Sequence, residues 1–225
     1  MKQLRILPLL LGCLALTAVS AFAQGTWDNG KAAMPVSRNG AAAATINEVM
    51  YVHGGKTGTN TLSNALSIYD GMTNTWSAGP TTAVSRSAHV AAVLNSKLYI
   101  VEGWTDTTEA VSTAAVDVYD PMTNTWSNDT SANVGRGAVA WGVINGKLYI
   151  TGGRLGSKNN GNIATLEIFD SSTHTWTTGA NIPTAVEAPA SAVANGKLYV
   201  IGGIINPAAS NTNIVQIYDP TTNTW

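Results

Sequence analysis

The chain is poor in cysteine, phenylalanine and charge. Its 225 residues include one cysteine, two phenylalanines and only 11% charged side chains. A single cysteine excludes a disulfide framework and any cysteine-rich zinc site. The formal charge of −1 provides no basic surface for a phosphate backbone, so nucleic acid is not an expected partner. With 44% hydrophobic residues, the chain has enough apolar surface for a packed globular body.

Long apolar runs are also missing, except at the N-terminus. No later stretch approaches the roughly 20 apolar residues that a transmembrane helix needs. The N-terminal run follows Lys2 and Arg5 and ends at Ala21-Phe22-Ala23, before Gln24. This layout predicts a secretory signal peptide over residues 1–23, and a mature protein of residues 24–225 that is exported to the periplasm or the extracellular space without a transmembrane span. Cleavage would remove the only cysteine.

An alternative interpretation of the N-terminus is a lipid anchor. The sequence Leu10-Leu11-Gly12-Cys13 is similar to a bacterial lipoprotein box, and a lipid on Cys13 would hold the protein at a membrane. The apolar run before Cys13 is short and the Ala-Phe-Ala site is better placed, so we favour cleavage after Ala23.

The rest of the chain repeats one unit four times. A turn sequence of the form Tyr-Asp-x-x-Thr-x-Thr-Trp recurs without gaps, with Phe replacing Tyr once. Trp27 has the same phase, and successive tryptophans are 49, 50, 50 and 49 residues apart. The repeats therefore run over about 27–76, 77–126, 127–176 and 177–225, and a fixed period of this size predicts a repeat architecture. The copies of the turn sequence are Tyr69–Trp76, Tyr119–Trp126, Phe169–Trp176 and Tyr218–Trp225.

A pair of residues, Gly-Gly in three repeats and Glu-Gly in one, forms a second marker. It follows an apolar run of the type Leu-Tyr-Ile, and glycine at its second position is invariant within this chain. The first position is glycine in three repeats and Glu102 in the other. The invariant glycines are Gly55, Gly103, Gly153 and Gly203.

Four strands are predicted in each unit. In the third unit, Ala138 to Ile144 form a first strand, and Asn145-Gly146-Lys147 make a tight hairpin turn. The run Leu-Tyr-Ile forms the second strand, the third strand ends at Tyr-Asp or Phe-Asp, and the tryptophan opens the fourth. The aspartate can accept N–H groups of the turn that follows it. An antiparallel unit of about 50 residues with four strands is typical of a propeller blade.

The paired glycines, the Tyr-Asp turn and the tryptophan resemble the Kelch repeat over essentially the whole mature chain. The resemblance implies an all-β, Kelch-type β-propeller with four four-stranded antiparallel blades. Kelch-like propellers usually close with six or seven blades, and Trp27 and Trp225 would compete for one position, so we expect an incomplete propeller from a longer protein. Open blade edges then predict self-association. The repeated aromatic residues are expected to pack between blades rather than to stack on sugars.

One repeat position is charged in every unit. It lies 10 or 11 residues after the tryptophan, just before the first strand, which is nearest the axis in a propeller. The residues at this position are Arg38, Arg86, Arg136 and Glu187. Two interpretations are open. Three guanidinium groups could bind an anion at the channel mouth, with Glu187 as general base or as internal counter-ion, or the arginines could donate to loop carbonyls of the next blade as scaffold.

Four further residues depart from the repeat pattern in loop positions. Together they could line a ligand pocket, and each could equally be an ordinary surface substitution. They are His89, Glu102, Trp104 and Arg154.

The sequence contains no pattern for a metal or a cofactor. His53, His89 and His174 fall in three different phases of the repeat, and no histidine pair has the spacing of a zinc motif. Nucleotide-binding fingerprints and a nucleophile elbow are also absent. We therefore expect neither metal nor cofactor.

Two functions fit these observations. The first is an exported binding or scaffolding module that recognises a protein or a glycan through loops at the propeller mouth. The second follows from a resemblance to the exported Kelch-like sialic acid mutarotases, which implies a cofactor-free isomerase acting on an anionic sugar. The Arg38, Arg86, Arg136 and Glu187 set is compatible with the second function.

Overall fold

A computed structural model describes residue 28 and residues 30–157, 161–206 and 208–225. The predicted signal peptide, the Cys13 anchor and Trp27 lie outside the described residues. The chain divides into two compact units, residues 1–31 and residues 32–225. All the strands belong to the second unit, and in the part of the chain described here no helix is long and apolar enough to span a bilayer.

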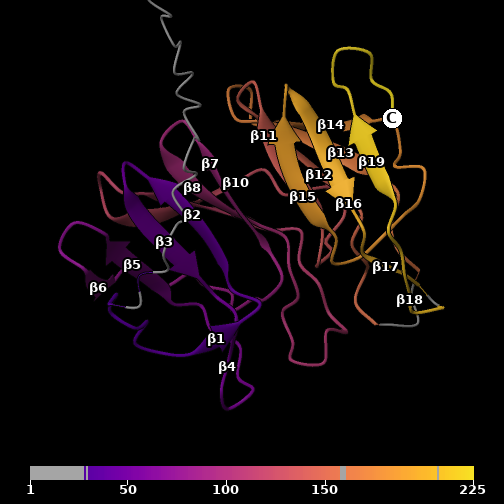
Figure 1. Cartoon of the computed structure of the whole chain (residues 1–225). Helices are drawn as coiled ribbons and strands as arrows, with labels where there is room; N and C mark the ends of the chain where they lie inside the picture. The colour runs from indigo at the N-terminus through magenta and orange to yellow at the C-terminus, as the bar shows by residue number, and fades with distance from the viewer. Residues whose placement is uncertain (1–27, 29, 158–160, 207) are drawn as a thin grey trace, which may run out of the picture. The chain divides into compact units, whose positions relative to one another are not determined.

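The second unit is all-β, and its four larger antiparallel sheets are the blades of a β-propeller (Figure 1). In each blade the strands are neighbours in chain order, as the repeat predicts. Blade one consists of β2 (Ala42–Ile46), β3 (Val49–His53), β5 (Leu66–Asp70) and β6 (Thr75–Ala78). Blade two consists of β7 (Val90–Leu94), β8 (Lys97–Val101), β9 (Val116–Asp120) and β10 (Thr125–Asp129). Blade three consists of β11 (Ala140–Ile144), β12 (Lys147–Thr151), β13 (Leu166–Asp170) and β14 (Thr175–Gly179).

Blade four has three strands instead of the predicted four. They are β15 (Ala190–Ala194), β16 (Lys197–Ile201) and β19 (Val215–Tyr218). Two short ladders lie in the loops: β1 (Arg38–Asn39) pairs with β4 (Lys56–Thr57), and β17 (Ile204–Ile205) pairs with β18 (Ser210–Asn211).

The hairpin turns have the left-handed backbone that the sequence predicts. In blade three, Asn145 and Gly146 have φ angles of 50° and 76°, the pattern of a type I′ turn. Blade one has Asn47 and Glu48 there with φ angles of 48° and 67°, so a residue other than glycine adopts the same turn. This turn joins the first and second strands in register, with Ile144 opposite Lys147.

The predicted aspartate turns also form. The Asp70 carboxylate accepts the N–H of Met72 at 2.8 Å, and that of Asp120 accepts the N–H of Met122 at 2.8 Å. Each turn therefore closes on its own side chain before the outer strand begins.

The hydrophobic core lies between consecutive blades. Leu98 and Ile100 of blade two are fully buried against Tyr51 and Leu66 of blade one. Equivalent apolar layers join blade two to blade three and blade three to blade four. In each layer, one sheet face packs on the face of the next blade, at an expected gain of about 25 cal/mol per Å² of apolar surface buried.

The repeated tryptophans also tie each blade to the segment before it. Every described tryptophan of the repeat lies beside an aromatic residue on the adjacent strand, and its indole N–H donates to a carbonyl 44 to 46 residues earlier. The donor and acceptor pairs are Trp76 and Ala32, Trp126 and Pro80, Trp176 and Thr130, and Trp225 and Ala180.

Backbone hydrogen bonds connect the blades near the first strands. The N–H of Ala88 donates to the Gly40 carbonyl, that of Ala138 to Ala88, and that of Ala188 to Ala138, at 2.8, 2.9 and 2.8 Å. All four residues have positive φ angles, between 49° and 62°. The three alanines therefore hold a conformation that costs a residue with a Cβ roughly 1–2 kcal/mol.

We expect Ala138→Gly to raise the free energy of unfolding by about 0.5 kcal/mol, because the relief of backbone strain exceeds the added entropy of the unfolded chain. Ala140→Gly, two residues on in a regular and fully buried strand position, should instead lower it by about 1.5 kcal/mol. Urea denaturation measures both values. A loss of stability in both variants would show that the Ala138 conformation is unstrained.

Candidate functional site

The candidate site lies at the end of the propeller where the second strands finish. At this end, one repeat position directly after the invariant glycine differs in chemical character from blade to blade. Its residues are Lys56, Trp104, Arg154 and Ile204. Trp104, Arg154 and Ile204 form bridges to the segment that enters the first strand of their own blade, so the position is held on regular backbone.

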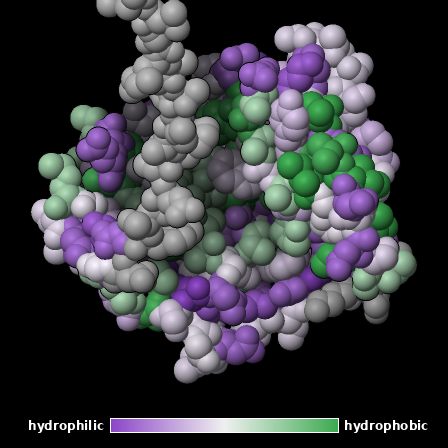
Figure 2. All heavy atoms as spheres, in the orientation of Figure 1, coloured by the Kyte–Doolittle hydropathy of each residue, from purple (hydrophilic) through white to green (hydrophobic). Residues whose placement is uncertain are grey.

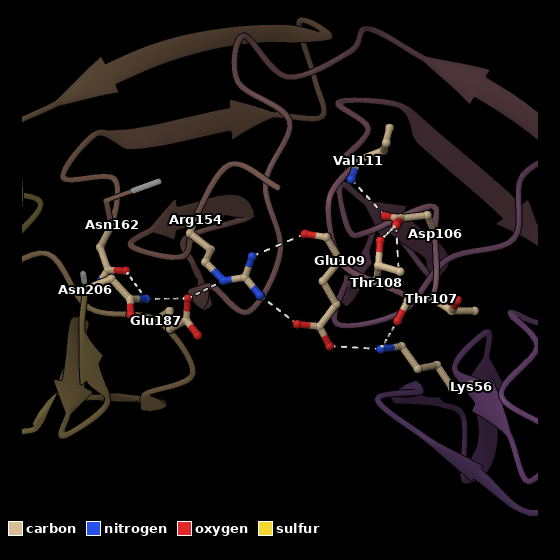
Figure 3. Close-up of polar contacts among 10 residues, drawn as sticks. All are labelled: Lys56, Asp106, Thr107, Thr108, Glu109, Val111, Arg154, Asn162, Glu187 and Asn206. Atoms are coloured by element: carbon tan, nitrogen blue, oxygen red, sulfur yellow. Dashed lines mark hydrogen bonds and ion pairs between the residues drawn. The ribbon is translucent and has the colours of Figure 1, made fainter. Parts of the chain in front are cut away.

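Arg154 is the centre of the site. Its side chain is fully buried, and its guanidinium carbon lies 4.4 Å from the ring centroid of Trp104. The Nε atom lies 2.5 Å from a Glu187 carboxylate oxygen, and Nη2 donates to a Glu109 carboxylate oxygen at 2.6 Å. Nη1 donates to the backbone carbonyl of Glu109 at 3.2 Å. Figure 3 shows Arg154 between the two glutamates.

Glu109 reaches Arg154 from a loop of blade two. Its φ angle of 62° is left-handed. Lys56 of blade one donates to the other Glu109 carboxylate oxygen at 2.9 Å and to the Thr107 carbonyl at 3.0 Å (Figure 3). One loop of blade two therefore contacts charged groups of blades one and three.

The loop is shaped by a single aspartate. Asp106 accepts the N–H of Val111 at 2.8 Å and the N–H and hydroxyl of Thr108. These bonds fold the loop before it contacts its neighbours.

The fourth blade completes the set. Asn206 donates to Glu187 at 2.8 Å and to the side-chain oxygen of Asn162 at 2.9 Å. We call Lys56, Glu109, Arg154, Glu187 and Asn206 the mouth cluster. It contains two cations and two carboxylates, so its formal charges balance, which offsets the cost of desolvating them.

The predicted pocket residues divide into two groups. Trp104 contacts Arg154, and Arg154 and Glu187 are paired within the mouth cluster. His89 and Glu102 lie deeper and are buried. Their role in ligand binding stays a prediction. Lys56, Glu109, Asn162 and Asn206 escaped the sequence analysis, because only the folded loops bring them to Arg154 and Glu187.

The three repeated arginines hold their own blades together. Each guanidinium donates to the carbonyl at the end of the second strand and to the carbonyl just before the third strand. The acceptors belong to the same blade, and not to the next one as the scaffold interpretation predicted. They are Gly54 and Ala65 for Arg38, Glu102 and Ala115 for Arg86, and Gly152 and Thr165 for Arg136.

Two of these arginines also pair with acidic residues on the third strand. Arg86 is paired with Asp117, and Arg136 donates to Glu167 at 2.7 Å, with both arginines fully buried. Arg38 donates to Ser67 at the same repeat position. The hydrogen bonds of the terminal nitrogens Nη1 and Nη2 offset part of the cost of burying such a charge.

The spacing placed Glu187 one residue out of phase with the arginines. The N–H of Gly103 donates to the Arg136 carbonyl, and the equivalent N–H of Gly153 donates to Val186. Val186 therefore occupies the arginine position in blade four, and Glu187 is equivalent to Gly137. The error arose because Arg38 lies 11 residues after Trp27, so a spacing of 11 residues was accepted for Glu187 as well. Val186 lies 10 residues after Trp176, at the spacing that separates Arg136 from Trp126.

Glu102 is a buried carboxylate with unusual surroundings. It replaces the first glycine of the pair, has a φ angle of 60° and is completely buried. Neither carboxylate oxygen has a hydrogen bond among the described residues, and the nearest cation is the Arg136 Nε at 3.6 Å. Desolvation raises the pKa of Glu102 to about 8; Arg136 opposes this rise, and the carboxylate of Glu167 adds to it.

Two histidines from different repeat phases meet between blades one and two. His53 Nδ1 lies 3.2 Å from His89 Nε2, and His53 Nε2 lies 2.9 Å from the Thr82 hydroxyl. Desolvation lowers the pKa of His53 to about 3 and also lowers the pKa of His89, so both rings are neutral at pH 7. Across the described residues, no group of three or more His, Cys, Asp or Glu side chains could hold a metal ion.

The chain belongs to the Kelch-repeat family. The Kelch motif matches residues 37–82, 85–131, 136–183 and 188–225, one segment for each blade. A Kelch propeller of this kind supports a binding or scaffolding function in general.

One solved structure, described as "Structure of YjhT", has the same fold. It superposes with a TM-score of 0.72 over 85% of this chain, at 21% sequence identity. The chain spans 65% of the length of that structure. At this level of identity the likeness establishes the fold alone. Comparison with curated proteins gave no match.

Glu102→Gln should raise the free energy of unfolding at pH 8 by several kcal/mol and change it little at pH 5. Because the folded-state pKa of Glu102 lies above the ordinary carboxyl value, the unmodified chain loses stability as the pH rises from about 4.5 to about 8. Glutamine has no proton to lose. Urea denaturation across this range measures the difference, with the exposed Glu48→Gln as control. Parallel pH profiles for all three proteins would contradict the prediction.

Proposed function

We propose that this Kelch-repeat protein is an exported binding module that recognises a protein partner through the loops around the mouth cluster. The observation that carries the proposal is that the turns and cores of the blades repeat, whereas the residue after the invariant glycine differs in every blade. The position after the invariant glycine is lysine, tryptophan, arginine and isoleucine in the four blades, although the turns and cores repeat. Loops on a fixed scaffold are where binding residues are expected to vary.

The surface beside the mouth cluster favours a protein as partner. Leu155 directly follows the variable position in blade three and is 44% exposed, and Val111, two residues after Glu109 in the loop of blade two, is 56% exposed. Exposed apolar side chains next to paired charges are typical of protein interfaces, which combine an apolar centre with a polar rim.

One cavity at this end lies beside Arg38 and Lys56 and measures about 220 Å³. Pockets that enclose drug-sized ligands usually occupy about 300–1,000 Å³. This cavity is therefore too small to enclose a drug-sized ligand.

The isomerase alternative loses its expected anion site. Arg86 and Arg136 are fully buried, and the guanidinium groups of Arg38, Arg86 and Arg136 donate to main-chain carbonyls. Glu187 is paired with Arg154 at the mouth rather than aligned with them. A glycan partner remains compatible with the proposal, as a ligand of the same loops.

Export rests on the N-terminal sequence. We expect the protein isolated from the cell envelope or the medium to begin at Gln24, because cleavage after Ala23 fits the Ala-Phe-Ala site. Intact-mass measurement and N-terminal sequencing test this. Recovery in the cytoplasm with Met1 retained would refute export. A lipid on Cys13 would show that the protein is anchored to a membrane and not released after cleavage at Ala23.

Partner recognition can be tested by photocrosslinking at two exposed apolar positions. Benzoylphenylalanine replaces Val111 at the mouth in one variant and Met122, 93% exposed in the turn at the opposite end of blade two, in the other. Irradiation in an envelope extract of the source cells should give discrete protein adducts from position 111 and none from position 122, because the partner contacts only the mouth.

A lower yield of the adduct on adding Lys56→Ala is expected, since that change removes the bonds that hold the Glu109 carboxylate and the Thr107 carbonyl to blade one. Adducts of equal yield from both ends, or adducts from position 122 alone, would place recognition elsewhere and overturn the proposal. Circular dichroism of each variant verifies that the propeller is folded.

A further inference from the structure

Blade four presents an apolar sheet face that its equivalents bury. In blade two, the cross-strand pair Val101 and Val116 is 0% and 1% exposed, because blade three covers it. The equivalent pair in blade four, Ile201 and Val215, is 42% and 54% exposed. The same repeat position is therefore core in one blade and surface in the other.

The exposed face continues across the sheet. Ile217 is 39% exposed, and its cross-strand neighbour is Tyr199. Figure 2 shows an apolar patch where β16 and β19 lie in Figure 1. A contiguous apolar patch on a soluble protein usually marks an interaction surface.

Tyr199 indicates what kind of surface would cover this face. In the first three blades, the equivalent tyrosine contacts an aromatic ring on the third strand of the following blade. The ring pairs are Tyr51 with Tyr119, Tyr99 with Phe169, and Tyr149 with Tyr218, at centroid distances of 5.7, 5.8 and 5.9 Å. The series predicts that Tyr199 packs against an aromatic ring on the third strand of another Kelch blade.

The backbone of blade four points to the same kind of occupant. The N–H groups of Gly55, Gly103 and Gly153 donate to a carbonyl of the following blade. The equivalent N–H of Gly203 has no hydrogen bond among the described residues, and neither does the Ala188 carbonyl, whose equivalents accept the N–H that links the blades. These are the groups with which a following blade would pair.

Blade one carries the complementary half of such an interface. Its face away from blade two contains Ala43 and Met50, at the positions of Ala91 and Leu98, which pack against blade one from blade two. Ala43 is exposed, whereas Ala91 is 1% exposed. Tyr69 supplies the aromatic ring at the position of Tyr119, Phe169 and Tyr218.

We propose that blade four of one copy packs against blade one of a second copy, head to tail, in the geometry that joins consecutive blades within the chain. Gly203 N–H then donates to the Arg38 carbonyl of the second copy, and Gly40 N–H of the second copy donates to Ala188. Tyr199 packs on Tyr69 of the second copy. The contact is heterologous, so it builds rings or open chains of copies.

Sedimentation velocity of the full chain over a concentration series tests the proposal. The unmodified chain should associate as concentration rises. Ile217→Lys on blade four and Ala43→Arg on blade one should each raise the dissociation constant at least about 100-fold, because each buries a lone charge in the interface. Met122→Lys, at a fully exposed turn, is the matched control and should not change it.

Mixing the two interface variants gives the sharpest result. Each variant keeps one intact face, so the mixture should form one-to-one dimers that do not grow further. Association that Ile217→Lys abolishes and Ala43→Arg leaves intact would mean that two copies of blade four pair with each other. A chain that stays monomeric at the highest concentration would also overturn the proposal.

Two controls separate this interface from other effects. The substituted residues are exposed in a single copy, so thermal melts of the variants at low concentration should match that of the unmodified chain. The interface is distinct from the mouth cluster, so its failure leaves the proposed partner recognition unaffected, and the reverse holds for the crosslinking experiment.

Discussion

Three backbone hydrogen bonds between the entrances to the first strands set the distance between consecutive blades. They connect Gly40, Ala88, Ala138 and Ala188, and each requires a left-handed residue. Glycine adopts this conformation without steric cost, whereas the three alanines adopt it at the cost given above. With this distance fixed, the second-strand side chains of one blade meet those of the next, and the apolar layers follow.

The fold could be predicted from the sequence because its signals are local and repeated. The Asn-Gly turns, the aspartate turns and the alternation of apolar runs each specify a backbone within a few residues, and four copies reinforce one another. The pair Phe169 and His174 illustrates how a local exception is compensated. In the other blades a tyrosine hydroxyl donates to an asparagine, whereas His174 instead bonds to Asp129 of blade two at 2.8 Å.

The site could be predicted only in part, because its contacts join residues that are far apart in the sequence. Trp104 and Arg154 stood out as departures from the repeat, and they do contact each other. Glu109 lies 45 residues before Arg154, in a loop that no periodic signal describes. The segment between Trp27 and Arg38 is one residue longer than its equivalents, and accepting that spacing in the fourth repeat assigned Glu187 to the arginine position, which Val186 occupies.

The mouth cluster has a consequence for the mechanics of the propeller. Lys56, Glu109, Arg154 and Glu187 come from blades one to four in order, so one ionic chain crosses every blade at this end. A ligand that displaces Glu109 would separate Lys56 from Arg154 and loosen blade one from blade three. Binding at the mouth and the spacing of the blades are therefore thermodynamically linked, and by reciprocity a change in blade spacing would alter the affinity of the mouth for its ligand.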